Sequence, residues 1–148
     1  MNQPLGTILV AVDFSEPSQR AIDAAVQLAK ATGARLTIFH AFELPMPAVT
    51  PYEVAIPPAY LEDSRKAAAA QLAGAVERAR EAGVEAESRL DEGPAAHSIA
   101  GAAEEIGADL VVVGTHGHTG FKHFVLGSVA ERTLRHAPCS VLTVKAHA

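Results

Sequence analysis

The chain contains 148 residues, of which 49% are hydrophobic, and we expect one domain that spans residues 1–148. Its formal net charge is -5 and no run rich in Lys and Arg occurs, which argues against nucleic acid or an anionic membrane surface as a partner. Cys139 is the single cysteine, and no apolar stretch approaches the roughly 18 residues of a membrane span. We therefore expect a cytoplasmic protein without an internal disulfide.

Strands and helices are predicted to alternate along the chain. Apolar segments bounded by turn residues predict strands at residues 7–13, 35–41, 84–90, 109–114 and 140–144. Helical patterns run from Ser15 to Gly33, over residues 59–82, after Gly93 and Pro94, and from Ser128 to about His136. This alternation is typical of parallel βαβ units, so we predict an α/β fold with an open five-stranded parallel sheet and helices on both faces.

Two of the predicted strands have the character of edge strands. Residues 84–90 alternate apolar and polar side chains, so one face is polar and the strand is expected at a sheet edge. The last strand, Ser140–Val144, has little polar protection and is expected at the opposite edge. An apolar edge of this kind favours pairing with a second copy of the chain, giving a homodimer; the alternative is an edge covered by the C-terminal tail.

The segment from Phe42 to Pro58 is long for a connection and contains several prolines. Such segments serve as lids or are surface excursions without function. We assign no chemistry to it.

A strand order of 3-2-1-4-5 would open a crevice at the carboxyl ends of the first and fourth strands, where open α/β sheets bind ligands. Asp13 ends the first of these strands and Gly114 ends the fourth, so the two residues are expected to face one pocket. The Asp13 carboxylate can accept a hydrogen bond from a ribose hydroxyl or an adenine amine, or it can cap the following helix, as Ser15 also can. Both readings stay open.

Glycines mark the passage from the fourth strand to the last helix. Gly114 and Gly117 follow the strand, and Gly127 and Ser128 precede the helix. A helix start leaves N–H groups unpaired, and glycines let the backbone approach an anion or adopt positive φ. The spacing of Ser128 and Glu131 predicts a capping box, in which the Ser128 hydroxyl caps while its N–H serves the anion. The simplest ligand is a nucleotide phosphate.

Histidines crowd the same loop. His116, His118 and His123 lie there with Lys122, but no further Cys, Asp or Glu cluster with recognisable spacing completes a metal site. We therefore expect no dedicated metal site and a solvated loop, in which Lys122 or a histidine could touch a terminal phosphate. His40 is expected to be a packed polar residue near the pocket mouth.

Familiar signatures of phosphoryl transfer and hydrolysis are missing from the sequence. It has no GxxxxGK[ST] loop, no GxGxxG after the first strand and no GxSxG elbow. Without a lysine and hydroxyl arranged to hold magnesium, and without a general base beside the glycines, binding is better supported than turnover.

Several motifs together resemble the universal stress protein family over essentially the whole chain. They lie around Asp13, at Phe39-His-Ala41, from Asp109 to Gly117, from Leu126 to Glu131 and from Ala137 to Val144. In that family, G-x2-G-x9-G-[ST] marks members that bind ATP, and Gly114, Gly117, Gly127 and Ser128 fill it here. The resemblance implies the sheet order 3-2-1-4-5, a Rossmann-like fold, a homodimer and an ATP-binding member.

The resemblance also implies a role for individual residues. Asp13 looks like the acidic residue on the adenosine side, and Ala41 like the position whose backbone contacts adenine. The remaining positions that would line the site or surround the ribose and phosphates are Val113, Gly114, Gly117, Gly127, Ser128 and Val129. Ala41 stands where the family often has valine, and Ser140 replaces a frequent proline after the cysteine.

These observations favour a stress-response or regulatory module that binds ATP, with magnesium carried by the nucleotide, and hydrolyses it slowly or not at all. Its output would be conformational or directed to a protein partner that the sequence does not identify. One alternative is a protein-interaction or chaperone-like member that binds no nucleotide. Another is a slow ATPase.

Overall fold

The computed structural model describes residues 4–43, 57–116 and 126–145, which contain five strands and four helices. Their order is β1 (Thr7–Ala11), α1 (Glu16–Thr32), β2 (Arg35–Phe42), α2 (Pro58–Glu81), β3 (Ala86–Glu92), α3 (Ala95–Ile106), β4 (Leu110–Gly114), α4 (Ser128–His136) and β5 (Ser140–Val144). None of these described helices has the length and apolar character that a membrane crossing requires.

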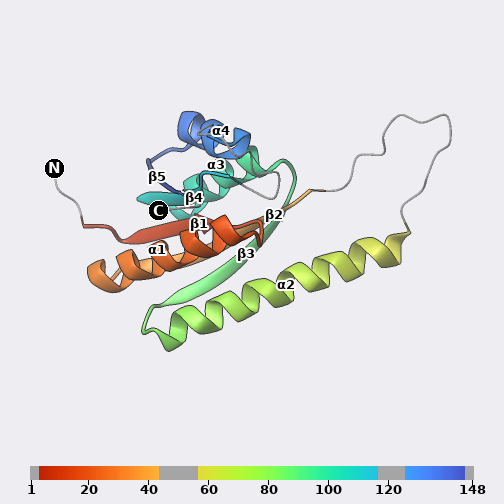
Figure 1. Ribbon diagram of the computed structural model, residues 1–148, viewed down its shortest axis with the longest axis horizontal. Helices are drawn as coiled ribbons and strands as arrows, with labels where there is room; N and C mark the ends of the chain where they lie inside the picture. The colour runs from red at the N-terminus through yellow and green to blue at the C-terminus, as the bar shows by residue number, and fades with distance from the viewer. Residues whose placement is uncertain (1–3, 44–56, 117–125, 146–148) are drawn as a thin grey trace.

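The strands form one parallel sheet with the order β3-β2-β1-β4-β5 (Figure 1). β1 lies in the middle and pairs with β2 on one side and β4 on the other. The predicted α/β fold, its strand order and both edge assignments are therefore confirmed. The chain leaves β1 and β4 in opposite directions, which is the arrangement that opens a crevice at their carboxyl ends.

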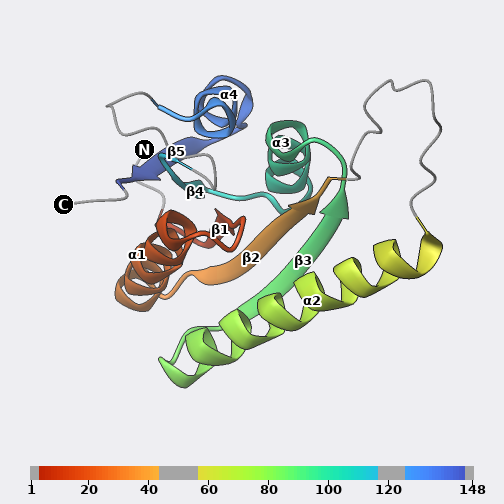
Figure 2. The same ribbon diagram turned by 45° about the vertical axis from the view of Figure 1, so that its right-hand side comes forward.

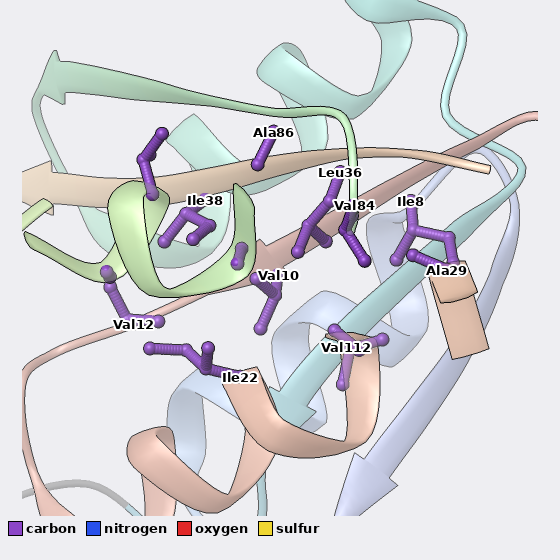
Figure 3. Packing of buried hydrophobic residues seen from close by; sticks show 14 of the residues in the cluster. Ile8, Val10, Val12, Ile22, Ala29, Leu36, Ile38, Val84, Ala86 and Val112 are labelled. Atoms are coloured by element: carbon purple, nitrogen blue, oxygen red, sulfur yellow. The ribbon is translucent and has the colours of Figure 1, made fainter. Parts of the chain in front are cut away.

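Helices cover both faces of the sheet (Figure 2). Side chains of a strand alternate between faces, and this divides the core in two. One buried cluster joins the first face to α1 and α2, and the other joins the second face to α3 and α4. Figure 3 shows the first cluster, where Val10, Leu36 and Val112 from neighbouring strands meet Ile22 of α1. Each such large side chain contributes about 1.5–3 kcal/mol by leaving water.

Local sequence explains where α1 begins and ends. The Ser15 hydroxyl accepts a hydrogen bond from the Ser18 N–H, Pro17 lies in the first turn, and Gly33 ends the helix in the left-handed conformation with φ 76°. These are the signals that predicted the helix, and its bounds agree with the prediction.

The third strand begins later than predicted. The Val84 N–H still bonds to the Ala79 carbonyl at 3.1 Å, so Val84 belongs to the turn that closes α2. Pairing with β2 starts as the Glu85 carbonyl accepts from the Leu36 N–H, and the strand continues to Glu92. The prediction of residues 84–90 was thus displaced by two residues at each end, because the helix-closing turn uses the first apolar position.

The two sheet edges differ in what covers them. At the β3 edge, Arg80 of α2 donates from Nε to the Ala86 carbonyl at 3.0 Å, and Arg65 pairs with Glu92. On β3 itself, the hydrogen bonds to Asp91 and Glu105 raise the pKa of Arg89. At the β5 edge, Leu142 is 37% exposed, and no side chain among the described residues bonds to that strand. The β3 edge is therefore partly closed by charge, whereas the β5 edge is largely apolar and has no such bond within the described residues. Residues 146–148 of the C-terminal tail, which were the predicted alternative cover, lie outside those residues.

Candidate functional site

A cleft of about 300 Å³ opens at the carboxyl ends of β1 and β4. Its lining residues come from β1, β2, β4 and the segments that follow those strands, and from α1, α3 and the start of α4. They are Ala11, Val12, Asp13, Ser18, Phe39, His40, Ala41, Ala95, Ile99, Val113, Gly114, Thr115, His116, Gly127, Ser128, Val129 and Ala130. The structure thus brings Asp13, Ala41, Val113, Gly114, Gly127, Ser128 and Val129 to one cleft, while their binding roles stay predictions. Gly117 lies outside the described residues.

One end of the cleft is apolar. Ala41 at the end of β2 lies opposite α3, whose Ala95 and Ile99 form the facing wall, and Val113 of β4 is 3% exposed in the same cluster. Small and branched apolar side chains on two sides suit a flat ring better than a charged group.

Asp13 lies two residues beyond β1 and braces the start of α1. Its Oδ1 accepts from the Ser15 N–H at 3.0 Å and from the Ser15 hydroxyl, while Ser15 itself caps the helix. Asp13 therefore supports the cap residue, and Ser15 is the cap. The carboxylate also lines the cleft, and its ligand-binding role stays a prediction.

The turn between Asp13 and Ser15 contains a strained residue. Phe14 has φ 64°, a left-handed conformation that costs a residue with Cβ about 1–3 kcal/mol and is commonest at functional turns. Its ring lies 4.5 Å from the ring of His40, whose Nδ1 is 2.7 Å from the Val12 carbonyl. Because a carbonyl only accepts, His40 carries its proton on Nδ1. His40 is the packed polar residue near the cleft that the sequence predicted.

Two glycines lie where backbones approach closely. A Cβ on Gly114 would be 3.2 Å from the Pro17 carbonyl oxygen, and a Cβ on Gly127 would be 2.8 Å from the Thr115 carbonyl oxygen. Gly127 has φ -60°, so the positive-φ explanation for it was wrong, and close approach is the reason for the glycine. Its N–H donates to the Thr115 carbonyl at 2.7 Å, and the Thr115 N–H donates to the Val144 carbonyl.

The start of α4 differs from the predicted capping box. Gly127 is the N-cap and Ser128 is the first helical residue, so the Ser128 hydroxyl makes no capping bond and that prediction was wrong. The first N–H of α4 that donates to a carbonyl one turn earlier is that of Glu131, which bonds to the Gly127 carbonyl at 2.9 Å. The N–H groups of Ser128, Val129 and Ala130 precede it and make no hydrogen bond within the described residues.

At the other two helix starts that border the cleft, a carboxylate accepts hydrogen bonds from the backbone. Asp13 lies at the start of α1, and Glu43 Oε1 accepts from the Ala95 N–H at the start of α3, 2.9 Å away. At α4 no side chain of residues 4–43, 57–116 or 126–145 caps the N-terminus, and Glu131 in its first turn is paired with Arg135. The positive end of α4 is therefore the place at this cleft where an anion is favoured, and the two carboxylates disfavour it at the opposite end.

The histidine-rich loop is only partly described. His118, Lys122 and His123 lie outside the described residues, as do residues 44–56 of the proline-rich segment. His116 is described: its Nδ1 lies 3.1 Å from the Thr115 hydroxyl, and its buried Nε2 has no hydrogen-bond partner within the described part of the chain. Among residues 4–43, 57–116 and 126–145, no three His, Cys, Asp or Glu side chains gather as a metal site would need.

Sequence reasoning missed several residues that line the cleft or hold its walls. Ala95 and Ile99 were expected only as helix residues, Thr115 was not singled out, and Glu43 was part of a segment to which no chemistry was assigned. No sequence signal identifies Glu43, because its partner Ala95 is 52 positions away. Cys139 is partly buried against the α3–α4 cluster; burial, and then the charge of Asp109, raises the pKa of its thiol.

The fold and cleft define a class: open parallel α/β proteins with a binding crevice at the point where the strand order reverses. Residues 4–145 match the universal stress protein family, and the chain belongs to that family. It is 36% identical over 144 residues to the Universal stress protein YxiE of Bacillus subtilis (strain 168), with 93% of this chain and 97% of that protein covered.

Solved structures agree with this assignment. A universal stress protein from Burkholderia pseudomallei is 36% identical, with a TM-score of 0.76 and coverage of 97% of this chain and 98% of that one. A universal stress protein in complex with cAMP is 30% identical, with a TM-score of 0.74 and coverage of 97% and 99%.

Replacing Gly127 by alanine tests the close approach at the start of α4. We expect Gly127→Ala to lower the free energy of unfolding by about 1–3 kcal/mol, because its Cβ would displace the Thr115 carbonyl. Gly101→Ala is the matched control, since a Cβ there meets nothing within 4 Å inside α3, and it should stabilise the protein by about 0.5–1 kcal/mol. Urea denaturation measures both; equal effects would contradict the role of Gly127.

Proposed function

We propose that this chain is an ATP-binding universal stress protein that acts as a regulatory module in the cytoplasm. The observation that carries the proposal is the uncapped start of α4 beside an apolar slot in the same cleft. A relative that is 30% identical forms a complex with cAMP, a nucleotide that also combines an adenine ring with a phosphate. The donor set fits such a ligand: apolar walls for a ring, a carboxylate for hydroxyls and helix amides for an anion.

The charges of the cleft suggest the orientation of the nucleotide. Adenine would lie between Ala41 and the α3 wall, and the ribose hydroxyls would donate to Asp13. The phosphates would accept from the Ser128 and Val129 amides, and Gly114 and Gly117 would let the backbone approach them. Asp13 and Glu43 would repel the phosphates from the base end. Magnesium would arrive with the nucleotide, as the phosphates supply its oxygen ligands.

The proposed output is conformational or partner-directed, without turnover as its purpose. No lysine of the described residues lines the cleft, and the sequence lacks the lysine and hydroxyl of a P-loop. Residues 1–148 would act as one nucleotide-binding domain whose bound state an unidentified protein partner reads.

We also propose a homodimer formed through the Ser140–Val144 edge. Leu142 of β5 is 37% exposed and Leu134 of α4, the helix that packs on β5, is 45% exposed. At the opposite edge Arg80 already occupies the Ala86 carbonyl. Pairing two β5 edges would bury apolar side chains and satisfy backbone groups together.

A proline at residue 128 tests the amide cradle without disturbing the helix. Proline is favoured at the first helical position, and Gly127, at φ -60° and ψ 153°, already has the conformation required before a proline. We expect Ser128→Pro to weaken ATP binding about tenfold, because one amide donor is lost. Isothermal titration calorimetry and the ATP-induced rise in Tm measure the loss.

The matched control is Ser128→Ala, which keeps the amide and removes only a hydroxyl that caps nothing. It should bind ATP nearly as the parent does. A parent protein that carries no nucleotide and gives no heat with ATP would favour the protein-interaction alternative. Equal Tm shifts in the parent and in Ser128→Pro would place the phosphates elsewhere.

ATP should survive incubation with the protein. We expect phosphate release from ATP with magnesium to match the rate without protein, because the described cleft offers no lysine to stabilise the transferring group. Colorimetric phosphate detection over hours measures it. Release above background that disappears in Asp13→Asn or Ser128→Pro would support the slow ATPase instead.

A charge on the β5 edge should separate the dimer. We expect Leu142→Lys to be monomeric in sedimentation velocity, because lysine resists edge pairing. Tyr60→Lys is the control: Tyr60 is 61% exposed, but it lies in the first turn of α2, away from β5. If the parent is a monomer, or if Leu142→Lys remains a dimer, the proposed interface is wrong.

A further inference from the structure

The apolar end of the cleft has two walls from different parts of the chain. One wall is the end of β2 with Ala41, and the other is the first turn of α3 with Ala95 and Ile99. The width of the slot therefore depends on how β2 and α3 are held relative to each other.

Two hydrogen bonds join these walls beyond the end of the sheet pairing. The Gly93 N–H donates to the Phe42 carbonyl at 3.1 Å, and the Ala95 N–H donates to Glu43 Oε1 at 2.9 Å. Of the two bonds, only the one to Ala95 involves a side chain. That side chain belongs to Glu43, the residue directly after β2. It attaches the end of the strand to a residue that itself lines the cleft.

The chemistry of this bond makes it effective despite its exposed position. Pro94, the N-cap of α3, makes no side-chain capping bond, so Glu43 supplies the cap from outside the helix. A carboxylate at a helix N-terminus combines a charge-assisted hydrogen bond with a favourable interaction with the helix dipole. Such a bond orders both groups that it joins.

We infer that Glu43 is a positioning residue for the base of the bound nucleotide, acting by clamping β2 to α3 across the slot. This inference rests on the proposed function and assigns a role to a residue that contacts no ligand. Glu43 does not line the cleft, and the open start of α4 belongs to a different wall. Loss of the clamp should therefore weaken recognition of the base without weakening recognition of phosphate.

The experiment compares ATP with inorganic tripolyphosphate, which has the phosphates and lacks the base. We expect Glu43→Ala to weaken ATP binding about fivefold in calorimetry. The concentration of tripolyphosphate that half-displaces a fluorescent ATP analogue, corrected for the affinity of the analogue, should not rise, because the substitution removes a negative charge and leaves the α4 amides in place. Glu43→Gln should restore most of the ATP affinity, because its amide oxygen can still accept from the Ala95 N–H.

Glu104→Ala is the matched control, since it removes an exposed carboxylate from the last turn of the same helix and should change neither affinity. Equal ATP binding by the parent and Glu43→Ala would overturn the inference and leave the proposed function standing. An equal loss of affinity for both ligands would also overturn it, since general damage to the cleft would explain that result. No binding of ATP by the parent would contradict the proposed function, and the inference with it.

Discussion

The candidate site depends on one hydrogen bond between two backbone segments, in which the Gly127 N–H donates to the Thr115 carbonyl at 2.7 Å. This bond sets the start of α4 against the end of β4, and the room for it exists only because residue 127 has no Cβ. The Thr115 N–H also donates to the Val144 carbonyl, so the same residue holds the end of the edge strand. Because the Gly127 N–H donates to Thr115, the α4 amides that lack a partner among the described residues begin at Ser128.

The cleft distributes charge between its ends through helix starts. Asp13 and Glu43 lie at the starts of α1 and α3, whereas no side chain of the described residues caps the start of α4. In the proposed complex, a ligand with one neutral and one anionic end would thereby be oriented before any specific contact forms. The strained Phe14 contributes to this arrangement, because the turn that it makes places Asp13 at the cleft.

The sequence predicted what depends on local pattern and periodicity. The alternation of apolar segments and the caps of α1 gave the element order, and the family resemblance supplied the strand order. Prediction from the sequence failed where a local signal competes with a tertiary contact. Ser128 and Glu131 have the spacing of a capping box, yet the contact with Thr115 makes Gly127 the cap. Val84 fits a strand pattern, but the turn closing α2 claims its N–H. Glu43 could not be found, since only folding brings it to Ala95.

The difference between the two sheet edges limits how many copies of the chain can join edge to edge. A sheet with two receptive borders can add copies without limit, as fibres do. Here Arg80 already occupies a carbonyl on one border. If two copies associate through the other border, as we propose, each then presents only its Arg80 side outward, and the assembly ends with the second copy.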